Sequence, residues 1–117
     1  GENIRREICF TLIDMGIEPE ASHHEEGPGQ NEIDFQYSDP LTAADNTATF
    51  KWVVSTAAMG NGLYADFSPK PIKEYAGNGM HINMSLSKDG KNLFMDPSDK
   101  YSLSKEAYYF IQLLMNM

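Results

Sequence analysis

Helical spacing of apolar residues marks the N-terminal part of the chain. Between residues 2 and 15 the apolar side chains recur every three or four positions, which predicts an amphipathic helix over residues 2–15. Gly16 is expected just past its end, where glycine is favoured because it adopts the left-handed conformation without strain. The residues expected on the apolar face are Ile4, Ile8, Cys9, Leu12 and Ile13.

A second helix, the longest of the chain, is predicted from the residues that mark its two ends. Asp39-Pro40 combines a capping acid with proline at the first helical position. Gly60-Asn61-Gly62 ends the same stretch. A broad apolar stripe indicates that this helix covers a sheet. The stripe includes Leu41, Ala44, Ala48, Trp52 and Ala57.

A last helix is predicted at the C-terminal end, where Ser104 is a candidate cap. Its apolar pattern continues to Met117 without a stop signal, and Gly1 is not a natural start. We therefore expect the chain to be an internal piece of a longer protein. The residues expected to face inward on this helix are Ala107, Tyr108, Ile111, Leu114 and Met115.

Two strands are predicted on either side of the turn signal Pro28-Gly29, because short β-prone runs flank it. The second of these strands is expected to end near Tyr37. A third strand is predicted over residues 63–68, where apolar and polar side chains alternate. Pro69-Lys70-Pro71 would stop it, because proline cannot continue a hydrogen-bonded ladder.

A fourth strand is predicted over residues 80–86, which alternate strictly between apolar and polar side chains. Asp89-Gly90 is a second hairpin turn, with Leu93 and Phe94 expected on the return strand. Residues 96–101 are expected to form a loop.

The order of these elements is helix, two strands, helix, two strands, helix. This order is typical of an α+β domain in which a mainly antiparallel sheet carries its helices on one face. A length of 117 residues suits one domain, so residues 1–117 are interpreted as a single unit. The other face of the sheet would carry the polar side chains, and we expect it to form the wall of a site.

Charge and composition exclude several classes of protein. The net charge is −8, from 17 acidic and 9 basic residues, which argues against a nucleic-acid partner because neutralising phosphates needs a basic surface. Cys9 is the one cysteine, so an internal disulfide is excluded. The sequence has no signal peptide and no apolar run long enough to span a membrane. We therefore expect a cytoplasmic protein with no membrane partner.

Acidic and imidazole side chains gather around the Pro28-Gly29 turn. A two-residue hairpin would set Glu25 opposite Glu32 and His23 opposite Asp34, with all four side chains on one face. Opposed carboxylates repel each other unless a cation lies between them, and Mg²⁺ and Mn²⁺ prefer carboxylate oxygens. The alternative is a solvated acidic hairpin. A longer or bulged loop would shift the register, because Pro-Gly favours a type II turn whereas tight hairpins prefer the primed types.

A second polar row is predicted on the fourth strand. His81, Asn83 and Ser85 alternate with apolar residues, so their side chains would share one face and could bind a metal and a polar ligand. The alternative is the solvated face of an edge strand. The preceding Gly77-Asn78-Gly79 is a flexible loop that exposes backbone N–H groups. It lacks the glycine spacing of dinucleotide-binding and phosphate-binding loops.

Three ordered motifs carry a resemblance to a known family. They are His23-His24-Glu25 through Gly29-Gln30-Asn31-Glu32, then Ser68-Pro69-Lys70-Pro71, then Gly77-Asn78-Gly79-Met80-His81. The first resembles the hairpin of glutamine synthetases that carries two metal-binding glutamates. The second resembles their Met-Pro-Lys-Pro, with serine in place of methionine, and the third their Asn-Gly-Ser-Gly-Met-His loop. The helix start Leu41-Thr42-Ala43-Ala44-Asp45 is similar as well, so the resemblance covers nearly the whole chain.

The resemblance implies a metal site. Glu25 and Glu32 would be ligands to divalent cations, Mg²⁺ or Mn²⁺, and His81 would hold the metal near the phosphates of ATP. No catalytic residue is assigned with certainty within the chain.

The resemblance also implies sites for both organic substrates. Glu20, Asn83 and Ser85 match positions that contact ATP, and asparagine replaces histidine at position 83 in some members of the family. Gly77 matches the glycine of the glutamate-binding loop. The asparagine expected before it is Ala76, and the serine expected after it is Asn78, so these two departures bear on substrate choice.

The implied reaction is the ATP-dependent synthesis of glutamine from glutamate and ammonia, through a γ-glutamyl phosphate. Members of the family are several times longer and form rings of identical subunits, and their other metal-binding glutamates and phosphate-binding arginines lie outside this stretch. We therefore expect a fragment from the middle of a catalytic domain, inactive when isolated. The alternatives are a fragment of a ligase that uses another amine, and a non-catalytic relative kept for binding or assembly.

Overall fold

Helix α1 (Glu2–Asp14) opens the computed structural model, which describes all residues from 1 to 117. Ile8 and Leu12 are buried on its inner face, whereas Ile13, expected to be on that face, is 53% exposed. Gly16 adopts a φ of +81° just past the helix end, as predicted, and the Ile17 N–H returns to the Leu12 carbonyl at 2.9 Å. The chain then turns toward the hairpin.

Strands β1 (Pro19–His24) and β2 (Asn31–Phe35) pair antiparallel around the Pro28-Gly29 turn. The register sets His23 opposite Glu32, with a bulge in β1 between Pro19 and Ala21. The predicted hairpin is therefore confirmed, and its second strand ends two residues before the expected position.

Helix α2 (Pro40–Gly60) has the predicted boundaries. The Asp39 side chain caps it by accepting a hydrogen bond from the Thr42 N–H at 3.2 Å. The side chain of Thr42 and its backbone N–H together lower the pKa of the Asp39 carboxyl, because both stabilise its charged form. The predicted apolar stripe is partly wrong, because Leu41 and Trp52 are 72% and 66% exposed.

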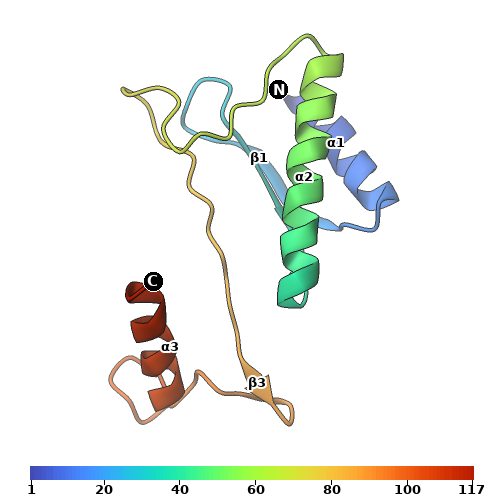
Figure 1. Cartoon of the computed structure of the whole chain (residues 1–117). Coiled ribbons are helices and arrows are strands. Elements are labelled where there is room, and N and C mark those ends of the chain that lie inside the picture. The colour runs from blue at the N-terminus through green and yellow to red at the C-terminus, as the bar shows by residue number, and fades with distance from the viewer. The chain divides into compact units, whose positions relative to one another are not determined.

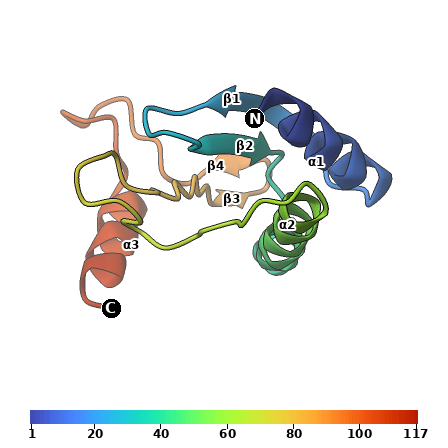
Figure 2. The ribbon, with the colours of Figure 1, turned by 90° about the horizontal axis from the view of Figure 1, so that it is seen from above.

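Both helices lie on the same side of the β1–β2 hairpin, as Figures 1 and 2 show. The core between them consists of Ile8 and Leu12 of α1, Ile17, and Val53 and Ala57 of α2. Ile33 and Phe35 of β2 pack against this core. The Phe35 ring lies 5.7 Å from the Phe50 ring, centroid to centroid. Since side chains alternate along a strand, Glu32 and Asp34 are left on the face away from the helices.

The chain divides into two compact units, Gly1–Gly79 and Met80–Met117. In the first unit, the strand predicted over residues 63–68 is absent, and this segment has irregular backbone. It pairs with no strand in the structure. An alternating pattern forms a strand only where a neighbour supplies the hydrogen bonds of the ladder.

The second unit contains β3 (Ser87–Lys88), β4 (Lys91–Asn92) and α3 (Lys105–Met115). The Asp89-Gly90 turn joins β3 and β4, as predicted, but the return strand ends before Leu93. The strand predicted over residues 80–86 is also absent, and every one of these side chains is exposed. Residues 96–101 are without regular strand or helix, as expected.

Helix α3 is capped by Ser104, as predicted. The Ser104 Oγ accepts a hydrogen bond from the Ala107 N–H at 3.1 Å and donates one to the Leu93 carbonyl at 2.5 Å. The predicted inward face is largely wrong, because Ala107 is buried but Met115 is 82% exposed. The helix ends at Met115 rather than Met117. Tyr108, Ile111 and Leu114 are also exposed.

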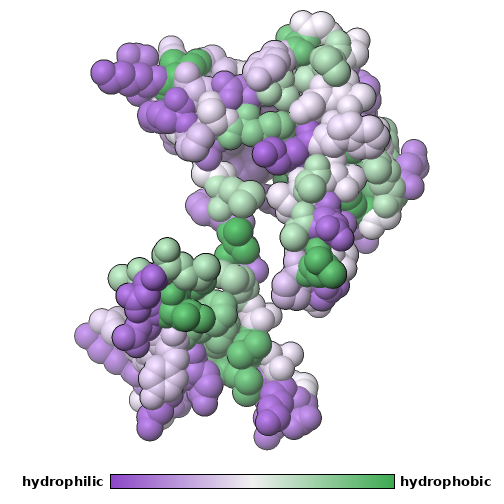
Figure 3. Space-filling model, in the orientation of Figure 1, coloured by the Kyte–Doolittle hydropathy of each residue, from purple (hydrophilic) through white to green (hydrophobic).

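The fold class is α+β with antiparallel strands, as predicted. The strands form two separate two-stranded sheets, β1–β2 and β3–β4. No helix is both long enough and apolar enough to cross a membrane. Figure 3 shows apolar side chains at the surface of each unit. The exposed apolar side chains include Met59 at 71% and Ile82 at 64%.

Candidate functional site

The tip of the β1–β2 hairpin is longer than the two residues predicted. The Gln30 N–H donates to the Gly27 carbonyl at 3.0 Å, and Gly29 has a φ of +71°, as the third residue of a type II turn requires. The Glu25 N–H then donates to the Gln30 carbonyl at 3.0 Å and closes the loop. The predicted register is therefore wrong by two residues, because Pro-Gly selects a turn that needs a longer loop.

A shift of two residues leaves every side chain on its predicted face, because side chains alternate with a period of two. His23, Glu25 and Glu32 therefore still meet on the side of the hairpin away from the helices. One ligand atom from each, an imidazole nitrogen or a carboxylate oxygen, lies within 4.8 Å of the other two. The His23 Nε2 is 2.7 Å from the Glu25 Oε1. We call these three residues the hairpin cluster.

His23 is the member of the hairpin cluster that the sequence reasoning placed on this face but did not assign as a ligand. In the structure it stands directly opposite Glu32, the position that the tight-hairpin register gave to Glu25. The signal that could have found it is its spacing, two residues before Glu25, which puts an imidazole beside both carboxylates once the loop is longer.

Charge accumulates at the hairpin cluster. Burial raises the pKa of the Glu32 carboxyl, and the neighbouring Asp34 and Glu25 carboxyls raise it further. His23 has the opposite effect and lowers the pKa of Glu32. The dominant neighbours are thus acidic, and a bound proton or a bound cation would relieve the same repulsion. The donor set of two carboxylates and an imidazole suits Mn²⁺ and, through its oxygens, Mg²⁺.

Helix α1 also fixes the start of β2 beside the hairpin cluster. The Arg5 Nη1 donates to the Asn31 Oδ1 at 2.6 Å, and the Asn31 Nδ2 donates to the Gly29 carbonyl at 2.8 Å. These contacts connect the helix to the residue before Glu32 and to the turn. The backbone at Glu32 is therefore fixed both by the strand pairing and by the contact of Asn31 with α1.

The predicted glutamate-binding loop lies in the same unit as the hairpin. A Cβ at Gly77 would lie 2.7 Å from the Pro69 carbonyl oxygen, so a side chain larger than hydrogen cannot be placed there without moving the backbone. The Asn78 N–H donates to that same carbonyl at 2.8 Å. Glycine at position 77 is thus required by a close backbone approach.

The remaining predicted site residues lie on exposed chain. Glu20 sits at the bulge of β1, where it has no partner in the β2 register. His81, Asn83 and Ser85 belong to the second unit and are exposed on irregular backbone. Their roles toward metal and ATP stay predictions.

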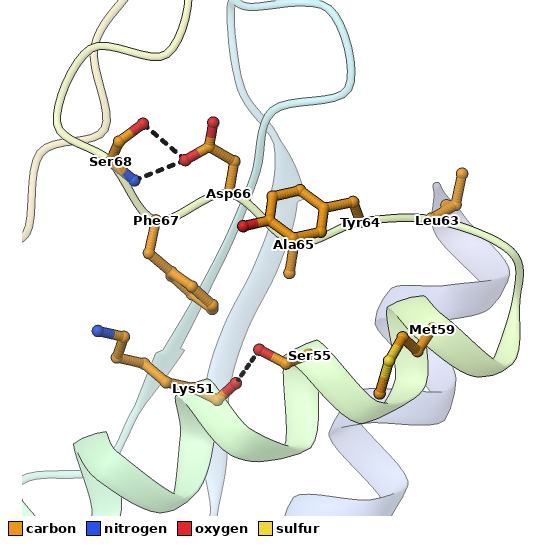
Figure 4. Close-up of a pocket in the computed structure, with 9 residues that line it drawn as sticks. All are labelled: Lys51, Ser55, Met59, Leu63, Tyr64, Ala65, Asp66, Phe67 and Ser68. Carbon is orange, nitrogen blue, oxygen red and sulfur yellow. Dashed lines mark hydrogen bonds between the residues drawn. The ribbon is translucent and has the colours of Figure 1, made fainter.

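An open hollow of about 490 Å³ lies between α2 and residues 63–68, and Figure 4 shows the side chains around it. The Lys51 ammonium lies 5.3 Å from the centre of the Phe67 ring. Asp66 accepts hydrogen bonds from both the N–H and the hydroxyl of Ser68, at 2.8 and 2.6 Å, which lowers the pKa of its carboxyl. None of the predicted site residues lines this hollow.

Comparison with known sequences gives one family over nearly the whole chain. Residues 1–116 match the family model described as "Glutamine synthetase, catalytic domain". A glutamine synthetase of Clostridium saccharobutylicum is 59% identical over 115 residues, and one of Thermus thermophilus is 55% identical over 115 residues. Each match covers 98% of this chain and 26% of the relative. The chain thus spans about a quarter of the length of these relatives.

Comparison with solved structures agrees with the comparison of sequences. The Plasmodium falciparum glutamine synthetase, determined by electron cryomicroscopy, matches with a TM-score of 0.86 and 39% identity over 93% of this chain and 21% of its own. The ligand-free form of GmaS also matches with a TM-score of 0.86, at 37% identity, over 97% of this chain and 27% of its own. A complex of GmaS with ADP gives a TM-score of 0.85.

Proposed function

Because the chain belongs to the glutamine synthetase family, we propose that it supplies part of the active site of an ATP-dependent ligase that joins ammonia to glutamate. The observation that carries this proposal is the hairpin cluster. Its two carboxylates and one imidazole converge within 4.8 Å at the hairpin that resembles the family's metal-binding motif.

Glu25 and Glu32 are the proposed metal ligands of this chain, with His23 beside them. The ion, Mg²⁺ or Mn²⁺, would neutralise negative charge on the phosphoryl group as it passes from ATP to the side-chain carboxylate of glutamate. His81 is proposed as a further ligand near the ATP phosphates. The two glutamates would bind the ion at the hairpin, Glu32 from β2 and Glu25 from the position directly after β1. Positions that the hairpin already fixes avoid reorganisation when substrate binds.

The organic substrates are proposed to meet the remaining residues. Glu20, Asn83 and Ser85 would contact ATP, and a complex of GmaS with ADP among the similar solved structures supports this proposal. The backbone around Gly77 would bind glutamate. In the proposed reaction the γ-carboxylate of glutamate attacks the terminal phosphorus of ATP and releases ADP. Ammonia then attacks the acyl carbon, and phosphate and a proton leave.

A second candidate function is a ligase that joins a different amine to glutamate. Ala76 and Asn78 favour it, because both stand where the resemblance leads us to expect other residues, next to the proposed glutamate-binding Gly77. A loop of altered shape would change which groups fit beside the reacting carboxylate.

We also propose that the longer protein is a cytoplasmic ring of identical subunits. Large apolar side chains such as Trp52 and Tyr64, at 66% and 88% exposure, support burial against further structure. Cys9 has no disulfide partner, which fits a reducing compartment.

The test is glutamine formation by the parent protein, expressed from its gene with the sequence that flanks this chain. Purified parent protein should form glutamine from glutamate, ammonia and ATP, and replacing ammonia by methylamine distinguishes the second candidate. The isolated 117-residue chain should form none, because it lacks the arginines that the resemblance places elsewhere in the family, and charge stabilisation dominates phosphoryl transfer. A parent protein that joins neither ammonia nor any other amine to glutamate would refute both candidates.

A further inference from the structure

The side chain of Gln30 connects two segments that lie almost fifty residues apart in the sequence. Its Nε2 donates to the Gly77 carbonyl and to the Asn78 Oδ1, each at 2.9 Å. Its Oε1 accepts from the Gly27 N–H at 2.9 Å. One amide therefore ties the tip of the carboxylate hairpin to the loop at residues 77–79. The bonds of Gln30 with Gly27 and Asn78 are partly shielded from water, whereas the bond to the Gly77 carbonyl is exposed.

Asn78 completes the connection from the other side. Its Nδ2 donates to the Ser68 carbonyl at 2.9 Å and to the Asp66 carbonyl at 3.3 Å, while its Oδ1 accepts from Gln30. An asparagine amide has two donor hydrogens and one acceptor oxygen, and all of them are engaged within the chain. The side chain of Asn78 is thus occupied by structure and is not free to bind a substrate.

The replacement of serine by asparagine at position 78 has a direct consequence. A serine hydroxyl offers one donor hydrogen, so it cannot donate to two carbonyls while accepting from Gln30. The amide can do all three. Because Gly77 already lies against the Pro69 carbonyl, the loop is fixed from two sides, by a close backbone contact and by the amide pair.

We infer that Gln30 and Asn78 are positioning residues, which fix the Gly77 loop against the tip of the carboxylate hairpin so that glutamate binds at a set place beside the metal. This inference rests on the proposed function, because it takes Gly77 as the glutamate-binding residue. Neither residue touches the reacting atoms. Their side chains act on the position of the Gly77 backbone, while the backbone of Glu32 is held by the β1–β2 ladder and that of Glu25 by its N–H bond to the Gln30 carbonyl, which a change of side chain at position 30 does not remove.

The test is a double-mutant cycle in the parent protein with Gln30→Met and Asn78→Ala. Gln30→Met keeps the volume and adds no charge near the hairpin cluster, but it removes both donors to the Gly77 loop and the oxygen that accepts from the Gly27 N–H. We expect each variant to raise the KM for glutamate roughly three- to tenfold, the effect of losing hydrogen bonds of this kind. The KM for ATP and the kcat should change by less than about twofold, since phosphoryl-transfer stabilisation is kept. The double variant should be no worse than the poorer single variant.

Gln36→Met is the matched control, because Gln36 is exposed and its side chain has no partner in the structure. It should leave the KM for glutamate unchanged. Thermal melts of all variants with and without Mn²⁺ report folding, and the rise in melting midpoint caused by Mn²⁺ should persist in every variant because the hairpin cluster is intact.

Four results would overturn the inference, each in a recognisable way. An unchanged KM for glutamate in both single variants, with glutamine formation intact, refutes the positioning role alone. Additive effects show that the two residues act independently. Loss of the Mn²⁺ response together with activity shows that Gln30 supports the hairpin rather than the loop. A parent protein without any glutamate-dependent activity refutes the proposed function, and this role with it.

Discussion

Strand β2 and residues 80–86 both alternate between apolar and polar side chains, yet only β2 forms a paired strand. The partner of β1 follows after a short turn, and the apolar face of β2 packs against Val53, Ala57 and α1. Residues 80–86 have no strand partner, and all their side chains are exposed. Alternation thus predicts which side chains share a face, while a strand also needs a hydrogen-bonding neighbour and a surface to cover.

The difference extends to function. In the hairpin, three potential metal ligands are brought within 4.8 Å by pairing within one unit. Along residues 80–86 the candidate ligand His81 stands on backbone that no ladder holds. A site built on a paired strand is fixed before its ligand arrives, whereas one on unpaired chain must be ordered by something else, at an entropic cost.

The largest loss of stability is expected from a substitution that disrupts the packing on which the hairpin depends. Leu12 has no exposed surface, so Leu12→Ala should lower the free energy of unfolding by about 2–5 kcal/mol. The same change at Leu86, which is 46% exposed at the end of the unpaired stretch, should cost less than about 0.5 kcal/mol. Urea unfolding followed by circular dichroism measures both. Equal losses would show that residues 80–86 are packed as tightly as the hairpin.

The second largest effect is expected from metal binding, which should stabilise the hairpin. An ion that binds only the folded state stabilises it by about 2.7 kcal/mol at a hundredfold excess over its Kd, and each kcal/mol moves the melting midpoint by roughly 2–8 °C. Millimolar Mn²⁺ should therefore raise the midpoint, and more than Mg²⁺ does, because imidazole suits Mn²⁺ better. Glu25→Ala with Glu32→Ala should abolish the response.

The matched control for this prediction is Glu18→Ala with Glu26→Ala, which removes the same charge from exposed positions outside the hairpin cluster. It should keep the Mn²⁺ response. Equal responses in the two double variants and the unmodified chain would place the ion elsewhere, and the hairpin would then be a solvated acidic surface.

A smaller effect is expected in the second unit, where a cap takes the place of an extensive core. Ser104→Ala removes the hydrogen bond to the Ala107 N–H and the one to the Leu93 carbonyl, and should cost about 1 kcal/mol. Ser87→Ala, at an exposed position in β3, is the control and should be nearly neutral. Thermal melts followed by circular dichroism at a helix-sensitive wavelength provide the measurement. No change in Ser104→Ala would mean that packing alone sets the start of α3.

The smallest effect is expected from the charge on Glu32 in the absence of metal. Its pKa is raised by burial and by acidic neighbours, so the carboxylate disfavours the folded state above its folded pKa, and the cost disappears below the unfolded value of 4.5. Glu32→Gln should therefore be slightly more stable than the unmodified chain at pH 7, in a chelator. That advantage should vanish as the pH falls to 4. An advantage that grows on acidification would reverse the sign of the assigned pKa shift.

Local signals along the chain determined much of this protein. The ends of α1 and α2 follow from Gly16, Asp39-Pro40 and Gly60-Asn61-Gly62, because caps act through hydrogen bonds between near neighbours. The shared face of Glu25 and Glu32 follows from a side-chain period of two, which survives a change in loop length. The motifs around these residues were enough to indicate the family.

Only the tertiary structure decided the features that depend on distant partners. The register that sets His23 opposite Glu32 depends on how the Pro28-Gly29 turn closes. Residues 63–68 and 80–86 do not form strands, because no neighbouring strand completes the hydrogen-bonded ladder. The bonds from Gln30 to Asn78 join residues 48 positions apart, and no periodicity along the sequence records such a separation. The spacing of residues along the sequence determines the direction in which a side chain points. A contact between two distant residues depends on the folded positions of both.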